Sequence, residues 1–90
     1  MKFELIIIGN ELLNGKIQDK NIHWFSQFCY EKNHTLSGVQ IIGDSKSDFK
    51  KALDKAKLIA DIIITTGGLG PTKDDITKSM MAEYFNKEII

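Results

Sequence analysis

The chain alternates between short segments rich in apolar residues and longer segments in which apolar residues recur every three or four positions. The short segments lie at residues 3–8, 35–42 and 62–64, and within them residues 5–8 and 62–64 are apolar without interruption. Continuous β-branched runs predict strands of a parallel sheet that is covered on both faces, since alternation with polar residues is not needed there. The unbroken run at 5–8 predicts a central strand. The more polar second run predicts an edge strand, in which Gly38 marks a bulge or close packing.

The periodic segments predict helices at 19–32, from 46 onward, and at 73–85. Asp19 and Ser45 are suited to cap the first two, because their side-chain oxygens can accept a backbone N–H at a helix start. In the second helix, spacings of three and four residues predict a face that packs on the sheet, formed by Phe49, Ala52, Leu53 and Ala56. In the first helix the corresponding stripe contains Ile22, Phe25 and Cys29, with Trp24 beside it.

Strands that alternate with helices predict an α/β fold, a three-layer α/β/α arrangement with a mainly parallel sheet. We expect residues 1–90 to form a single domain. Because three strands make a small sheet with an unpaired edge, we expect this domain to be the N-terminal part of a larger one, or to rely on a partner.

The segment 61–77 joins an apolar strand, a glycine-rich turn and a helix start. Gly67, Gly68 and Gly70 can adopt positive φ and let a ligand approach the backbone. After Pro71, Thr72 can serve as an N-cap, with Asp75 three residues later as in a capping box. Backbone N–H groups and the helix dipole favour an anion at such a place, so the segment predicts a phosphate site.

Asp74 and Asp75 stand in the first turn of the same predicted helix, where they would repel a phosphate. A hard cation between the charges resolves this conflict. Mg²⁺ suits the role because it binds one or two carboxylates together with phosphate oxygens. The alternative is that both carboxylates only cap the helix.

Two further carboxylates are candidates because they follow strands at the end of a parallel sheet where ligands bind. Glu11, in a loop after the first strand, could contact a ligand hydroxyl or a metal; Asp44, after the second, could join the cation or act in acid–base chemistry. From the residues alone, a solvated loop carboxylate and an ordinary turn aspartate are the preferred interpretations.

Composition narrows the class of protein. The chain has 12 basic and 12 acidic residues and a formal net charge of zero, so it lacks the positive charge typical of nucleic-acid binders. No apolar run approaches the roughly 20 residues needed to span a bilayer. The single cysteine cannot form an intrachain disulfide, and it fits a cytoplasmic protein.

Three blocks together resemble one known family, the N-terminal domain of the CinA (competence/damage-inducible) proteins. They occur in the family's order and spacing and cover nearly the whole chain. The blocks are Ile8-Gly9-Asn10-Glu11-Leu12-Leu13-Asn14-Gly15-Lys16-Ile17 with Asn21, then Ile42-Gly43-Asp44, then Thr65 to Thr77 around Thr66-Gly67-Gly68-Leu69-Gly70.

The resemblance implies a molybdopterin-binding-type fold, shared with molybdenum-cofactor biosynthesis proteins, and frequent trimers. It implies that Thr66, Gly67, Gly68 and Gly70 bind a phosphate, and that Thr72 belongs to the same ligand site. Asp44 and Asp75 match two aspartates implicated in metal insertion in the molybdenum branch, and Asp74 belongs to the acidic pair of the CinA branch.

The implied activity is Mg²⁺-dependent hydrolysis of ADP-ribose in the complete domain. The alternative is a module that binds molybdopterin or a nucleotide without turnover. Either way, the expected partners are a phosphorylated small molecule and further copies of the chain, as a trimer or dimer.

Overall fold

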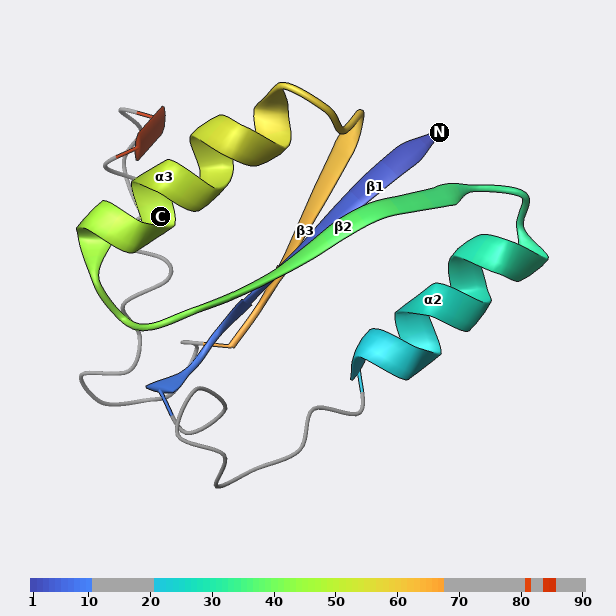
Figure 1. Cartoon of the computed structure of the whole chain (residues 1–90), viewed down its shortest axis with the longest axis horizontal. Coiled ribbons are helices and arrows are strands. Elements are labelled where there is room, and N and C mark those ends of the chain that lie inside the picture. The colour runs from blue at the N-terminus through green and yellow to red at the C-terminus, as the bar shows by residue number, and fades with distance from the viewer. Residues whose placement is uncertain (11–20, 68–80, 82–83, 86–90) are drawn as a thin grey trace.

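A computed structural model describes residues 1–10, 21–67, 81 and 84–85. Five elements follow one another in these ranges (Figure 1). They are β1 (Lys2–Ile8), α2 (Asn21–Glu31), β2 (Thr35–Ile42), α3 (Lys46–Lys57) and β3 (Ile62–Thr66). The predicted strands are therefore confirmed, as are the two helices between them. The helix predicted at 73–85 lies largely outside the described residues.

The three strands form one parallel sheet in the order β2-β1-β3. β1 is central, and residues 5–8 are fully buried, as the unbroken apolar run predicts. One expectation for β3 was wrong. All five of its residues are half-buried, not covered on both faces, because within the described residues β3 has a sheet neighbour on one side only.

The two helices lie on opposite faces of the sheet (Figure 1). α3 packs its predicted face, Phe49, Ala52, Leu53 and Ala56, against Ile6 and Ile8 of β1, and all six residues are buried. The two alanines let the helix backbone approach the strands closely, while Phe49 and Leu53 fill the space between. Met81 and Tyr84 pack against this cluster from the C-terminal part of the chain.

α2 covers the other face with aromatic residues. Phe25 contacts Phe3 of β1 with ring centroids 5.8 Å apart, and Cys29 is buried, as expected. Trp24 lies off this stripe, 62% exposed, and its ring stacks on Phe28. α2 ends at Glu31, and two residues later Asn33 has a φ of 61°, the left-handed conformation that often follows a helix.

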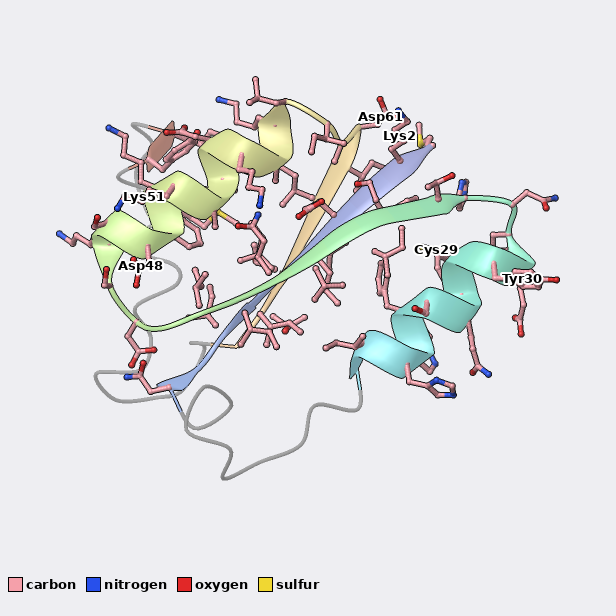
Figure 2. The ribbon with its side chains drawn as sticks, viewed as in Figure 1. Lys2, Cys29, Tyr30, Asp48, Lys51 and Asp61 are labelled. Atoms are coloured by element: carbon pink, nitrogen blue, oxygen red, sulfur yellow. The ribbon has the colours of Figure 1, made fainter. Side chains whose placement is uncertain are left out.

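At the end of the sheet where the strands begin, polar groups of the chain bond to one another. Lys2 and Asp61 face each other there (Figure 2): the Lys2 N–H donates to the Asp61 carboxylate at 2.8 Å, and the Asp61 N–H donates to the Lys2 carbonyl. Just inside, Glu4 is 96% buried and accepts hydrogen bonds from the Ser37 hydroxyl and the Gln40 amide.

Gly38 lies opposite this buried carboxylate. The register between β1 and β2 shifts at this point, which confirms the predicted bulge. A Cβ on Gly38 would stand 2.8 Å from a Glu4 carboxylate oxygen, so close packing is confirmed as well. Glycine is needed because the Glu4 side chain occupies the space that another residue's Cβ would take.

Candidate functional site at the carboxyl edge of the sheet

The carboxyl ends of the three strands meet at one edge because all the strands are parallel. Ile8 of β1 pairs with Ile42 of β2, and Thr66 of β3 pairs with Ile7. A glycine follows each strand: Gly9, Gly43 and Gly67. The edge is thus built from three segments that are more than 20 residues apart in sequence, and this end of an α/β sheet is where ligands commonly bind.

Gly67 forms the start of the glycine-rich turn and is held against β1. Its φ is +89°, a conformation that residues with a Cβ rarely adopt. A Cβ built there would stand 2.1 Å from the Ile8 carbonyl oxygen, closer than any real contact. Two independent constraints therefore require glycine at this position: backbone conformation and the approach of another strand.

Asp44 lies on the same edge and is tied to the end of β1. Its carboxylate accepts a hydrogen bond from the Asn10 side-chain amide at 3.3 Å. The Gly9 N–H also donates to the Ile42 carbonyl at 2.9 Å, so the loops after β1 and β2 leave the sheet together. Asp44 is half-buried, so its carboxylate is partly exposed to solvent at the strand ends.

The N-terminus of α3 starts directly after Asp44. Ser45 has extended backbone angles, and its hydroxyl accepts the Asp48 N–H at 3.0 Å, which confirms Ser45 as the N-cap. This bond fixes where the helix begins. The end of β2, the Asp44 carboxylate and the capped start of α3 therefore follow one another directly along the chain.

Three of the predicted site residues fall in the described part of the chain, and all three lie at this edge: Asp44, Thr66 and Gly67. Thr66 is the last residue of β3 and is half-buried. The other predicted site residues lie outside the described residues: Glu11, Gly68, Gly70, Thr72, Asp74 and Asp75. Their predicted roles therefore stay predictions.

Sequence reasoning missed Asn10 as a partner of Asp44. The signal was present in part, since Asn10 belongs to the first of the blocks that resemble CinA proteins. What could not be read from the sequence is that its amide meets a carboxylate 34 residues away. Within the described residues no three His, Cys, Asp or Glu side chains gather as a metal site would require.

Comparison with known proteins agrees with the fold. The profile of a family described as a probable molybdopterin binding domain matches residues 4–90. The chain belongs to this family. Its central sheet, its glycine turn and Asp44 are therefore parts of a molybdopterin-binding-type domain.

Several relatives in sequence are CinA proteins. The chain is 47% identical over 90 residues to a competence-damage inducible protein of Clostridium beijerinckii. It is 40% identical, also over 90 residues, to a CinA-like protein of Dictyoglomus thermophilum. In each case the match covers all of this chain but only 22% of the relative, so the chain corresponds to about a fifth of their length.

Solved structures show the same arrangement of strands and helices. A CinA protein of unknown function from Thermoplasma acidophilum matches 94% of this chain with a TM-score of 0.86 and 26% identity. A tungsten cofactor synthesizing protein, MoaB from Pyrococcus furiosus, matches 98% with a TM-score of 0.81 and 31% identity. These matches cover 50% and 55% of the two solved chains. No described helix of the present chain is long and apolar enough to cross a bilayer.

Proposed function

We propose that the complete domain binds a phosphorylated pterin or nucleotide at the carboxyl edge of the sheet and hydrolyses a diphosphate of the ADP-ribose type with the help of Mg²⁺. The observation that carries this proposal is that Asp44, Thr66 and Gly67, at the ends of β2 and β3, lie at one sheet edge. Membership of a molybdopterin-binding family supports a phosphorylated ligand there.

The glycine turn would hold the phosphate. Gly67 carries no Cβ, and its backbone is pressed against Ile8, so the turn that follows β3 starts close to the ends of the neighbouring strands. The Thr66 hydroxyl at the strand end is a further hydrogen-bond donor for a phosphate oxygen. A ligand bound beside Thr66 and Gly67 would therefore meet a hydroxyl and backbone groups.

Asp44 is the described residue best suited to hold Mg²⁺. Carboxylate oxygens are the hard ligands that this ion prefers, and the Asn10 amide occupies one side of the carboxylate only. Asp74 and Asp75 would complete the set in our proposal. Bound Mg²⁺ would neutralise the diphosphate and lower the pKa of an attacking water.

A second candidate is binding without turnover. It is favoured by the likeness to MoaB, which its own description names as a tungsten cofactor synthesizing protein. On this hypothesis the same edge holds a molybdopterin-like ligand, and the carboxylates position it or a metal. Both candidates use the same residues, so only the fate of the ligand separates them.

The test uses the longer protein that contains the complete domain. It is incubated with ADP-ribose and Mg²⁺, and AMP and ribose phosphate are measured. We expect product formation that is lost when Mg²⁺ is chelated and lost in Asp75→Asn and Asp44→Asn. Asp61→Asn is the matched control. Asp61 lies at the other end of the strands, just before β3, and accepts a hydrogen bond from the Lys2 N–H.

Tight binding of a pterin without any product would contradict hydrolysis and support the second candidate. Neither binding nor turnover would contradict both. Wild-type activity in Asp44→Asn would show that the strand edge is not where the chemistry occurs.

We further propose that the chain assembles with copies of itself. Trp24 and Tyr30 of α2 are 62% and 81% exposed, which leaves a large aromatic area in contact with solvent. Mass measurement in solution should give a multiple of 10.2 kDa. A well-folded monomer at high concentration would contradict this proposal.

A further inference from the structure

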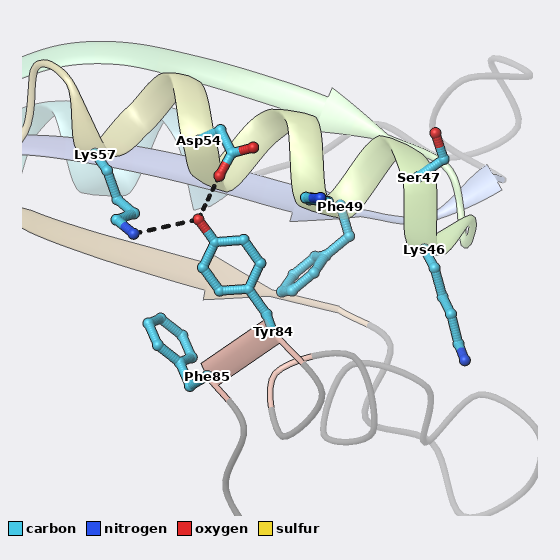
Figure 3. Close-up of a pocket in the computed structure, with 8 residues that line it drawn as sticks. Lys46, Ser47, Phe49, Asp54, Lys57, Tyr84 and Phe85 are labelled. Atoms are coloured by element: carbon cyan, nitrogen blue, oxygen red, sulfur yellow. Dashed lines mark hydrogen bonds between the residues drawn. The ribbon is translucent and has the colours of Figure 1, made fainter.

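A pocket of about 730 Å³ lies along α3, on the side of the helix next to Tyr84 and Phe85 (Figure 3). Its lining runs from Lys46, at the first turn of the helix, to Lys57, at the last. The volume lies in the range of pockets that hold small molecules. The three described residues of the edge site, Asp44, Thr66 and Gly67, are not among its described lining residues.

Tyr84 forms one wall and is fixed in place by polar contacts to α3. Its hydroxyl donates to the Asp54 carboxylate at 2.5 Å and accepts a hydrogen bond from the Lys57 ammonium at 3.4 Å (Figure 3). The same ammonium lies 5.2 Å from the Tyr84 ring centroid, within reach of a cation–π interaction. This part of the pocket is therefore held together by the protein's own groups.

Among the described lining residues, positive charge exceeds negative charge. They include three lysines, Lys46, Lys50 and Lys57, and one carboxylate, that of Asp54, which accepts the Tyr84 hydroxyl. Lys46 and Lys50 are four residues apart, so their stems lie on one side of the helix. α3 as a whole has five lysines and two aspartates, a net charge of +3 in a chain whose net charge is zero. The first turn of α3 adds the positive end of the helix dipole.

Phe85 gives the pocket an apolar surface on which an aromatic ring can pack. Its side chain is 49% exposed although it is aromatic, and its ring meets that of Tyr84 edge to face, with centroids 4.9 Å apart. A flat ring placed in the pocket could pack on Phe85. Its charged substituent would then lie toward the lysines of α3.

We propose that this pocket binds an aromatic compound that carries a phosphate. The lysines attract the anion, and the partly exposed Phe85 ring supplies the apolar contact that a simple anion cannot use. The proposal is independent of the function suggested for the carboxyl edge, since the described residues of the two sites do not overlap.

The test is a titration of the ¹⁵N-labelled chain with phenyl phosphate, followed by NMR chemical shifts. We expect saturable shifts at the amides of Lys46, Lys50, Tyr84 and Phe85. Inorganic phosphate lacks the aromatic ring and phenol lacks the phosphate, so each should bind more weakly than phenyl phosphate. Raising the salt concentration should weaken binding of phenyl phosphate, because the ammonium groups are exposed and therefore screened.

Lys50→Gln and Lys51→Gln form a matched pair. Both residues are exposed, they are neighbours on α3, and each change removes one positive charge, but only Lys50 lines the pocket. Loss of one exposed charge contact should weaken phenyl phosphate binding about twofold to fivefold in Lys50→Gln. Lys51→Gln should leave the affinity unchanged within error.

Equal weakening in the two variants would overturn the proposal, because it would show a general effect of net charge. Phenol that binds as tightly as phenyl phosphate would also overturn it. Shifts centred on Thr66 and Gly67 would place the ligand at the sheet edge, which would support that site and contradict this one.

Discussion

Both ends of the sheet carry carboxylates and other polar side chains, but the two ends differ in what these groups contact. At the N-terminal end, Lys2 and Asp61 bond to each other, and the buried Glu4 carboxylate is satisfied by Ser37 and Gln40. At the carboxyl end, the described polar side chains are half-buried or exposed: the Asn10 amide donates to the Asp44 carboxylate, and the Ser45 hydroxyl accepts the Asp48 N–H.

The difference teaches which polar residues stabilise and which are available for binding. A carboxylate buried among donors, like Glu4, holds strands in register and has little room for a ligand. A carboxylate at the strand ends, like Asp44, bonds to Asn10 alone among the described residues and is only half-buried. Substitutions at the two ends should therefore differ in whether they change stability or binding.

The largest effect on stability is expected for Gly67→Ala at the carboxyl end. Alanine would have to adopt a φ of +89° and would place its Cβ against the Ile8 carbonyl, which is backbone and cannot rotate away. We expect a loss of about 2–4 kcal/mol in the free energy of unfolding, measured by urea denaturation. A loss below that of Gly38→Ala would contradict the assignment of Gly67 as the more constrained glycine.

Gly38→Ala tests the N-terminal end and should cost less, about 1–2 kcal/mol. The Cβ would meet the Glu4 carboxylate at 2.8 Å, but this is the end of a side chain that can move. A double-mutant cycle with Glu4→Ala sharpens the test, because alanine removes the atoms that a Cβ at position 38 would meet, so the two effects should be non-additive. Additive losses would indicate that Glu4 is not what restricts position 38.

Ser45→Ala removes the cap of α3 beside the carboxyl edge. Loss of the bond to the Asp48 N–H should lower the free energy of unfolding by about 1 kcal/mol. Ser47→Ala, two residues later and exposed, is the control and should change stability by less than about 0.5 kcal/mol. Equal losses would mean that the capping bond does not contribute.

Asp44→Asn should have the smallest effect on stability, below about 0.5 kcal/mol, because asparagine keeps the shape and can still accept the Asn10 bond. Its effect on Mg²⁺-dependent ligand binding should be much larger, since the charge is lost. Calorimetric titration of wild type and variant at equal Mg²⁺ checks this. A variant that is unstable but binds normally would reverse the roles that we assign to the two ends.

The sequence by itself determined the elements and the position of the central strand. Continuous apolar runs and three- to four-residue spacing located three strands and the buried face of α3, and Ser45 marked where that helix begins. These features depend on local pattern, which is why they can be read without a structure. The order of the blocks also indicated the family and the edge where Asp44 and Thr66 lie.

Only the tertiary structure decided how distant residues combine. The half-buried state of β3 depends on which strands lie beside it, and the bond from Asn10 to Asp44 depends on two loops meeting. The requirement for glycine at position 67 arises from the Ile8 carbonyl, and the pocket along α3 arises from Tyr84 reaching Asp54. Each of these features depends on contacts between residues far apart in sequence. Such contacts are set by three-dimensional packing, so the local sequence pattern cannot predict them.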